Sequence, residues 1–391
     1  ARGNNASSFP HGTNAGSAYV RTVVYTADAT DPLNVDYVVT KTADTQDGSC
    51  NTDCSFLEAL VAANADSTTT FLTIDFEVPT TDSGCNTDGV CTISPTRQLP
   101  TLTRGNITVN GYTQDGTIVL SGSAAGTNVR GLSINSSHNT IAGLVINQFS
   151  NNGMNITGRD NVITANQITG NGGSGIYLAL TATDTVITDN EITDNTSSGL
   201  YSAATNTTLT GNTISSNTKH GIQINNGSGS SITGNTIESN VLNGIYIVTG
   251  AHYIASNTIA SNGQRGVYLN TTNTSGNHIS QNSFYSNSGA GITLANGANS
   301  AKTAPRITIG NIFGSVVTIA GTAASGDTIE VFIASSDNEG QTYLATTTAD
   351  SSGTWTITTT ATLVPPRTKV VATATDTANN TSSFSTARTV R

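Results

Sequence analysis

The chain has 391 residues, a formal net charge of −10, 39 glycines and only 10 % charged residues, and this length predicts two or three domains. The acidic, charge-poor composition contains no Lys/Arg cluster and excludes a nucleic-acid-binding protein, because phosphates require a basic surface. No run of about 18 apolar residues occurs, so the sequence predicts no membrane span.

The first residues predict a secreted protein with an N-terminal extension at 1–36. The chain starts with Ala1 and Arg2 rather than with Met or an apolar leader. We therefore expect a mature product whose export signal has been removed, located outside the cell or on its surface. Residues 18–25 are typical of a β-strand without an evident partner, which makes them a candidate donor strand for a neighbouring molecule. Its interface candidates are Tyr19, Val20, Val23, Val24 and Tyr25.

Residues 37–100 are expected to form a disulfide-containing N-terminal cap and the first coils of the next domain. All four cysteines, Cys50, Cys54, Cys85 and Cys91, fall here, and an even, clustered set in an exported chain indicates two disulfides. Three pairings are possible, of which we favour Cys50–Cys54 with Cys85–Cys91. A zinc site is the weaker alternative, because these spacings are not the CxxC pairs of zinc sites.

The same region contains one expected helix, at 55–64. Asp53 or Ser55 would cap this helix, and Glu58 follows Ser55 at the spacing of a capping box. The apolar residues lie on one stripe, which predicts that the helix packs on the end of the neighbouring domain. The stripe consists of Phe56, Leu57, Leu60 and Val61.

An internal repeat of 22 to 25 residues dominates residues 101–301. Each unit has a glycine followed by an apolar–x–apolar triplet, and a motif Asn–x–Ile/Phe–x–x–Asn precedes the later glycines. Three short strands of period two per unit, without helical periodicity, predict a parallel β-solenoid with inward columns about 4.8 Å apart. We expect the Asn residues at left-handed corners, with amides that stack along the solenoid. The repeat glycines are Gly131, Gly153, Gly175, Gly199, Gly221, Gly244, Gly266 and Gly291.

This pattern resembles the right-handed parallel β-helix of pectate-lyase-like and surface-exposed bacterial proteins. The segment 54–59, CSFLEA, is similar to the Cys-Ser-Leu-Arg-Glu-Ala segment at the N-terminus of many secreted bacterial β-helix proteins, with Phe56-Leu57 in place of Leu-Arg. The resemblance implies an all-β, right-handed parallel β-helix with coils of about 22 residues and a capping role for this segment. It implies no single activity, because this architecture occurs in lyases, hydrolases, adhesins and inert fibres.

Residues 302–391 predict a second domain, because the Asn columns stop and longer alternating stretches begin. Seven expected strands and one tryptophan, Trp355, suggest an Ig-like β-sandwich. This part resembles the bacterial Ig-like modules that often follow such β-helices. The expected strands are 306–312, 316–323, 328–335, 342–348, 354–360, 369–375 and 383–390.

Carboxylates give only a weak candidate for catalysis in the repeat. Polysaccharide lyases and hydrolases need clustered carboxylates, or Ca²⁺-binding carboxylates with a nearby basic residue. The acids of the repeat concentrate in one coil, with no second carboxylate directly above or below, so a solvated face explains them better than a catalytic pair. We therefore expect no enzyme, no metal and no cofactor. The acids are Asp184, Asp189, Glu191 and Asp194.

Two groups of outward residues remain as candidate interfaces. Lys219, His220 and Arg265 fall near one corner, two coils or roughly 10 Å apart, where they would bind an acidic sugar or lie in solvent as turn residues. The middle residue of each glycine triplet points outward and is tyrosine in four units. This column would stack on sugars, bury against another subunit, or stabilise the solenoid face itself. The four are Tyr177, Tyr201, Tyr246 and Tyr268.

These observations favour a secreted structural or adhesive β-helix protein, with copies of itself as the main partner and surface glycans as a second one. Joined head to tail through its N-terminal strand, such a subunit would form an extracellular filament, because a heterologous contact does not close. The alternative is a β-helix protein that binds or cleaves polysaccharides. A third interpretation is a fragment of a cell-surface adhesin with the Ig-like domain as a stalk.

Overall fold

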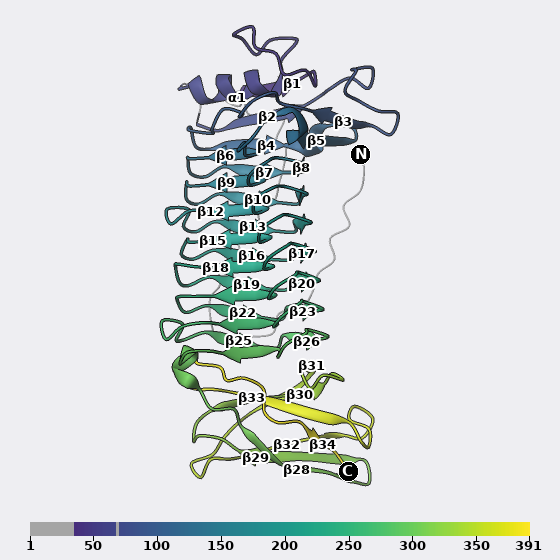
Figure 1. Cartoon of the computed structure of the whole chain (residues 1–391), viewed down its shortest axis with the longest axis vertical. Coiled ribbons are helices and arrows are strands. Elements are labelled where there is room, and N and C mark those ends of the chain that lie inside the picture. The colour runs from purple at the N-terminus through teal and green to yellow at the C-terminus, as the bar shows by residue number, and fades with distance from the viewer. Residues whose placement is uncertain (1–34, 68–69) are drawn as a thin grey trace. The chain divides into compact units, whose positions relative to one another are not determined.

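The structure is a computed structural model that describes residues 35–67 and 70–391 (Figure 1). The expected donor strand at 18–25, with Tyr19, Val20, Val23, Val24 and Tyr25, lies outside the described residues. Residues 35 and 36, which the sequence assigned to the extension, belong to the first strand, β1 (Val35–Val39).

The first part of the described chain is a parallel β-solenoid of about nine turns with about 23 residues per turn, which confirms the predicted all-β fold class. Its strands form three parallel sheets, because each coil adds one short strand to each sheet (Figure 1). Sheet A consists of β1, β2 (Leu72–Phe76), β4 (Ile107–Asn110), β7 (Thr140–Ala142), β10 (Val162–Thr164), β13 (Val186–Thr188), β16 (Thr208–Thr210), β19 (Ser231–Thr233), β22 (Tyr253–Ala255) and β25 (His278–Ser280). Sheet B consists of β3 (Val90–Ile93), β5 (Thr117–Ser121), β8 (Leu144–Asn147), β11 (Gln167–Thr169), β14 (Glu191–Thr193), β17 (Thr213–Ser215), β20 (Thr236–Glu238), β23 (Thr258–Ala260) and β26 (Ser283–Tyr285). Sheet C consists of β6 (Leu132–Ile134), β9 (Met154–Ile156), β12 (Ile176–Leu178), β15 (Leu200–Ser202), β18 (Ile222–Ile224), β21 (Ile245–Ile247), β24 (Val267–Leu269) and β27 (Ile292–Leu294).

The solenoid core is a set of apolar columns with one residue per coil. Ile163 pairs in register with Ile141 on one side and with Ile187 on the other, and all three side chains are fully buried. Burial of one such side chain contributes roughly 1.5–3 kcal/mol. The strict period of the repeat therefore fixes the register, since a slip by one residue would turn each column outward.

Two columns of buried asparagines run along the solenoid at its corners. Asn190 is representative: its backbone N–H and its Nδ2 both donate to Asn212 Oδ1 at 3.0 Å, and Nδ2 also donates to the carbonyls of Ile163 and Thr188. The predicted amide stacking is thereby confirmed, but the left-handed residue is the one before each Asn, for example Asp189 with φ 56°. The first asparagine ladder contains Asn166, Asn190, Asn212, Asn235, Asn257 and Asn282, and the second contains Asn171, Asn195, Asn217, Asn240, Asn262 and Asn287.

The glycine before each sheet C strand is required by close approach rather than by its backbone angle. A Cβ on Gly199 would lie 2.5 Å from Ile214 Cγ2, 2.8 Å from Asn217 Nδ2 and 2.9 Å from the carbonyl oxygen of Gly221. Only a residue without a side chain fits between these neighbours in the next coil. The repeated glycine therefore permits the tight packing of the second asparagine ladder against the core.

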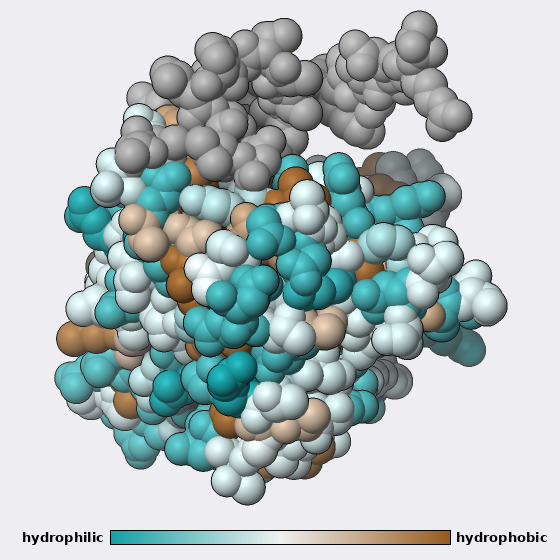
Figure 2. Space-filling model, turned by 90° about the horizontal axis from the view of Figure 1, so that it is seen from above, coloured by the Kyte–Doolittle hydropathy of each residue, from teal (hydrophilic) through white to brown (hydrophobic). Residues whose placement is uncertain are grey.

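The N-terminal end carries the expected helix, α1 (Phe56–Ala65), which packs on β1 and β2. Ser55 caps it in a capping box with Glu58, and the Phe56 ring lies 5.5 Å from that of Phe76. Figure 2 shows this end with hydrophobic residues scattered among hydrophilic ones. Two short 3₁₀ turns, η1 (Gly111–Thr113) and η2 (Gly122–Ala124), follow in the next coils. No helix in the described residues is long and apolar enough to cross a bilayer.

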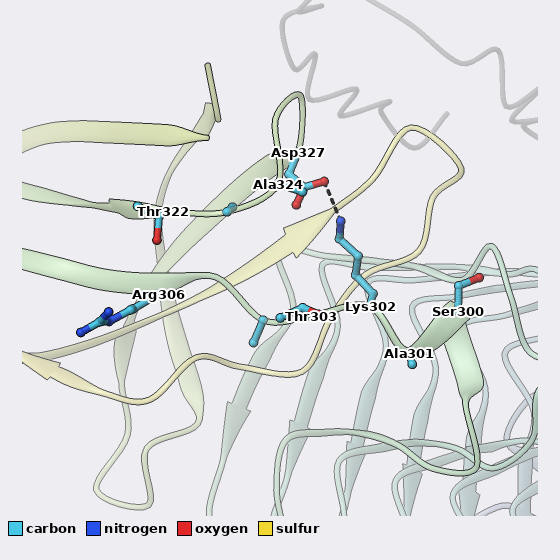
Figure 3. Close-up of a pocket in the computed structure, with 10 residues that line it drawn as sticks. Ser300, Ala301, Lys302, Thr303, Arg306, Thr322, Ala324 and Asp327 are labelled. Carbon is cyan, nitrogen blue, oxygen red and sulfur yellow. Dashed lines mark hydrogen bonds and ion pairs between the residues drawn. The ribbon is translucent and has the colours of Figure 1, made fainter. Parts of the chain in front are cut away.

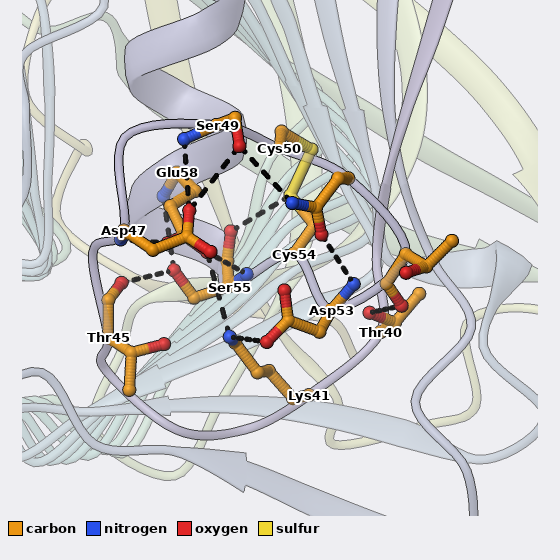
Figure 4. The surroundings of a disulfide bond; sticks show 12 residues. Thr40, Lys41, Thr45, Asp47, Ser49, Cys50, Asp53, Cys54, Ser55 and Glu58 are labelled. Atoms are coloured by element: carbon orange, nitrogen blue, oxygen red, sulfur yellow. Dashed lines mark hydrogen bonds and ion pairs between the residues drawn. A yellow bond between two sulfur atoms is a disulfide. The ribbon is translucent and has the colours of Figure 1, made fainter.

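The four cysteines form the two favoured disulfides, Cys50–Cys54 and Cys85–Cys91. Figure 4 shows the first disulfide beside Glu58, whose carboxylate accepts hydrogen bonds from the backbone N–H of Asp47 at 2.7 Å and of Ser55 at 2.8 Å. Burial raises the pKa of Glu58, but these hydrogen bonds and the charge of Lys41 together lower it by more than burial raises it. The pKa of Glu58 therefore lies below its ordinary value. Glu58 is therefore an ionised anchor that fixes the disulfide loop to α1.

The C-terminal domain consists of two antiparallel sheets, compatible with an Ig-like region. It follows the 3₁₀ segment η3 (Ala298–Ala301), and its core contains the buried Trp355. The last strand is much shorter than the expected 383–390, because the backbone N–H groups of Ala372 and Ala374 donate to the hydroxyls of Ser385 and Ser382 rather than to backbone carbonyls. The strands are β28 (Arg306–Phe313), β29 (Val316–Thr322) and β32 (Thr354–Thr360) in one sheet, and β30 (Thr328–Ala334), β31 (Gly340–Thr348), β33 (Lys369–Thr375) and β34 (Arg388–Thr389) in the other.

The C-terminal domain covers the last coil of the solenoid with side chains that continue its hydrogen bonds. Glu330 accepts from the Ser280 hydroxyl and from the backbone N–H of Gln281. Thr381 accepts at its hydroxyl from the backbone N–H of Ile279 at 2.9 Å. The open end of a solenoid would otherwise expose unpaired strand edges, so this domain serves as its C-terminal cap.

Candidate functional site

The four predicted tyrosines do lie in one outward column of sheet C. In-register pairing runs from Tyr177 to Tyr201, on through Gln223 to Tyr246 and then to Tyr268. All five side chains are partly exposed. We call these five residues the tyrosine row.

The rings of the tyrosine row pack on one another and on two neighbours. Tyr177 and Tyr201 stack with centroids 5.1 Å apart and planes 7° apart, whereas Tyr246 and Tyr268 are tilted at 5.6 Å. His220 stacks on Tyr246 at 4.6 Å, and the Arg265 guanidinium lies 4.5 Å above the Tyr268 ring. These contacts cover ring faces, so the row presents mainly ring edges and hydroxyl groups. Stacking of sugars flat on the rings, one of the expected modes, is therefore limited.

Side-chain amides hold the tyrosine hydroxyls in place. Asn225 Nδ2 donates to Tyr201 Oη at 3.0 Å, and Asn270 Nδ2 donates to Tyr246 Oη at 2.8 Å. Gln223 Nε2 donates to Asn225 Oδ1 at 3.0 Å. Neither asparagine is among the predicted site residues, although each stands two residues after a member of the row, at 223 and 268. That offset was the available signal.

His220 is the predicted basic residue whose role the structure changes most. Its side chain is 8 % exposed, and its Nδ1 accepts a hydrogen bond from the backbone N–H of Asn243 at 3.2 Å. Burial, followed by the nearby charge of Lys219, lowers the pKa of His220 to about 4. His220 is therefore neutral at pH 7 and cannot attract an anion. Of the other two expected basic residues, Arg265 lies over the Tyr268 ring, and Lys219 precedes His220 in the chain.

The acidic coil lies away from the tyrosine row, along sheets A and B. Its four acids, Asp184, Asp189, Glu191 and Asp194, are all exposed. Asn206 donates to Asp184 at 3.1 Å. The described residues contain no group of three or more His, Cys, Asp or Glu side chains placed to hold a metal ion.

A cavity of about 410 Å³ lies one coil beyond the end of the row, at the junction with the C-terminal domain. Thr293 pairs with Tyr268 and so continues the column into this cavity. Residues 337–339 and 383–385 line the opposite side. We call this space the junction cavity.

A second cavity, of about 450 Å³, lies where the chain enters the C-terminal domain. Its Lys302 and Asp327 pair at 2.6 Å, with side chains 12 % and 5 % exposed (Figure 3). Since these charges satisfy each other, this cavity offers less to a ligand than the junction cavity does, and the ion pair is better explained as a structural clasp.

Comparisons with known proteins support the fold. Residues 103–259 match the family model of the right-handed β-helix region, and no curated protein matches the chain. Similar solved structures include the A-module of the Azotobacter vinelandii mannuronan C-5 epimerase AlgE4, at 16 % identity over 58 % of this chain and 71 % of that one, with a TM-score of 0.38. The pectate lyase Pel9A has 15 % identity over 66 % and 78 %, with a TM-score of 0.43. The enzymatically active domain of the bacteriophage CBA120 tailspike protein 2 has 14 % identity over 88 % and 61 %, with a TM-score of 0.34.

The expectation that the chain is not an enzyme is corrected by these comparisons, since the similar structures named above are an epimerase, a lyase and an enzymatically active domain. The carboxylates nearest to the end of the row, Asp337 and Glu339 in the junction cavity, come from the C-terminal domain and therefore fall outside the columns of the repeat. Nothing in the described residues or the comparisons supports a filament subunit. Self-association and extracellular location stay predictions.

Proposed function

We propose that this protein binds a polysaccharide along the tyrosine row of sheet C. The observation that carries the proposal is the pair of hydrogen bonds that fix Tyr201 through Asn225 and Tyr246 through Asn270. A surface fixed in this way loses little side-chain entropy when a ligand binds. The hydroxyl and amide groups can hydrogen-bond to the hydroxyls of a sugar chain, and the aromatic edges can contact its apolar C–H groups.

The length of the row fits an oligosaccharide rather than one sugar ring. Tyr177 and Tyr268 are four coil steps apart, which corresponds to roughly 19 Å at about 4.8 Å per step. Lys219 and Arg265 would add charge-assisted hydrogen bonds to a polymer that carries carboxylates. A panel of acidic and neutral polymers tests this preference directly.

The binding test uses isothermal titration calorimetry of the full chain with mannuronan, polygalacturonate and xylan. We expect at least one polymer to bind, and the double variant Tyr201→Ala/Tyr246→Ala to weaken that binding about tenfold or more. Tyr253→Ala is the matched control, because Tyr253 is 45 % exposed on sheet A rather than sheet C. Equal loss in both variants, or no binding by the wild type, would refute the proposal.

A separate assay distinguishes binding from cleavage. The same polymers are incubated with the protein, with and without Ca²⁺, and both unsaturated products and new reducing ends are measured. Product formation that the Tyr201→Ala/Tyr246→Ala variant loses would show that the row also serves a catalytic reaction. Binding without product would identify the row as a binding surface for these polymers.

A further inference from the structure

The junction cavity combines groups from both domains at the end of the tyrosine row. From the solenoid come Thr293 and its neighbours on β27, and from the C-terminal domain come Asp337, Asn338 and Glu339. Ligand sites occur preferentially at such domain interfaces. Because β27 is the last strand of sheet C, a polymer that follows the row reaches the C-terminal domain here.

The aromatic ring of Phe384 lines this cavity and is partly exposed. It is held edge to face by Phe284 and Phe332, both at 5.6 Å. The glycines beside it make room for the ring: a Cβ on Gly340 would lie 2.5 Å from it, and one on Gly291 would lie 3.0 Å from it. The rings of the row lie on an open sheet face, whereas this ring lines a concave site, where apolar C–H groups of a sugar would pack against it.

The charge of the cavity selects among sugars. Asp337 and Glu339 supply carboxyl groups, and no Lys, Arg or His occurs among the described residues that line the cavity. The nearest basic contact is Lys369, whose Nζ donates to Asn338 Oδ1 at 3.0 Å. The buried Glu339 carboxyl accepts from Asn287. Asp337 is exposed and accepts from the Ser336 hydroxyl at 3.4 Å, which leaves lone pairs to accept sugar hydroxyls. A uronate or sulfated sugar would be repelled by the Asp337 carboxylate, and a sugar without negative charge would not.

We propose that the junction cavity binds the terminal sugar of the bound polysaccharide, and that this sugar carries no negative charge. The proposal rests on the proposed function, because the tyrosine row leads the chain to the cavity. Asp337 accepts hydrogen bonds from the sugar hydroxyls, and Phe384 packs against the ring. The row and the cavity thus differ in preference: Lys219 and Arg265 favour acidic units along the row, and Asp337 disfavours them at the end.

The test titrates the full chain with neutral hexasaccharides of xylose, glucose and mannose, and with hexagalacturonate. We expect the wild type to bind at least one neutral hexasaccharide. Asp337→Ala should weaken the neutral ligand about tenfold, the usual effect of losing a hydrogen bond to a charged group. Asp337→Arg should bind hexagalacturonate more tightly than the wild type does, because the repulsion at the terminal sugar is replaced by attraction. Asp115→Arg, an equal charge change at an exposed residue near the other end of the solenoid, should change neither affinity.

The outcomes separate the two proposals. Loss of hexasaccharide binding in Tyr201→Ala/Tyr246→Ala, with wild-type affinity and selectivity in both Asp337 variants, would overturn the terminal site and leave the row as the binding surface. Wild-type binding in the tyrosine variant would overturn the proposed function. Circular dichroism of each variant controls for folding, and Asp337 is a suitable target because its exposed side chain does not belong to the core.

Discussion

The carboxylate of Glu339 occupies the position that the next asparagine would take in the second asparagine ladder. Asn287 donates its backbone N–H to Glu339 Oε2 at 3.2 Å and its Nδ2 to Oε1 at 3.2 Å. Within the ladder, each asparagine makes the same two donations to the Oδ1 of its successor, as Asn262 does to Asn287. The C-terminal domain therefore ends the ladder with an ionisable group in place of an amide.

This substitution predicts that the stability of the junction depends on pH. Burial, partly offset by the hydrogen bonds from Asn287, raises the pKa of Glu339 from 4.5 to about 7, and burial also raises the pKa of Glu330. A raised carboxyl pKa means that the folded protein binds the proton more tightly than the unfolded chain does. The contribution from Glu339 is fully present below about pH 4.5 and is lost as the pH rises through 7. Its size is on the order of 3 kcal/mol.

Thermal unfolding between pH 4.5 and 8, followed by circular dichroism, measures this dependence. We expect the wild type to lose stability as the pH rises through 7, and Glu339→Gln to flatten the profile while keeping an oxygen that accepts from Asn287. Glu77→Gln, a change at an exposed carboxyl on the solenoid, is the control. A Glu339→Gln profile as steep as that of the wild type would contradict the assignment.

The asparagine ladders predict a large penalty for a single substitution at mid-ladder. Asn212→Ala would leave the backbone N–H of Asn190 without its acceptor, and it would remove the Asn212 amide that donates to the carbonyls of Ile187 and Thr210. Unsatisfied buried polar groups cost roughly 1–3 kcal/mol each, so a loss of about 3–5 kcal/mol is expected. Urea denaturation measures it, with the exposed neighbour Thr213→Ala expected to change stability by less than about 0.5 kcal/mol. Similar midpoints for the two variants would show that the ladder contributes little.

The glycine before a sheet C strand and the left-handed glycine before an asparagine of the first ladder should respond differently to substitution. Gly199→Ala places a methyl group 2.5 Å from Ile214 and should destabilise by roughly 1–3 kcal/mol. Gly234 has φ +65°, and a Cβ at this position would have nothing within 4 Å. Because asparagine tolerates left-handed backbone, Gly234→Asn should be close to neutral. Melting temperatures of both variants test the distinction, which fails if Gly234→Asn is the more damaging change.

The repeat made the solenoid predictable, because period-two strands and recurring glycines repeat the same local physics in every coil. The helix at Ser55 and both disulfides were also predictable, since each depends on neighbours within six residues. The contacts of His220 and Asn225 were harder to predict, because each depends on a group from an adjacent coil, the backbone N–H of Asn243 for His220 and the Tyr201 hydroxyl for Asn225. The junction cavity was not predictable, since Thr293 and Asp337 belong to different domains and no periodic signal relates them.

The ion pair between Lys302 and Asp327 provides a last test, at the entrance to the C-terminal domain. Both side chains are largely buried, and Lys302 Nζ lies 2.6 Å from Asp327 Oδ1. Removing one partner therefore leaves an uncompensated charge, which typically costs about 3–5 kcal/mol. Lys302→Met and Asp327→Leu should each destabilise by about that amount, whereas the double variant should recover much of the loss. Urea denaturation of all four proteins completes a double-mutant cycle. Additive losses in the double variant would mean that the two charges are stabilised independently of each other, and the clasp would then have no energetic role.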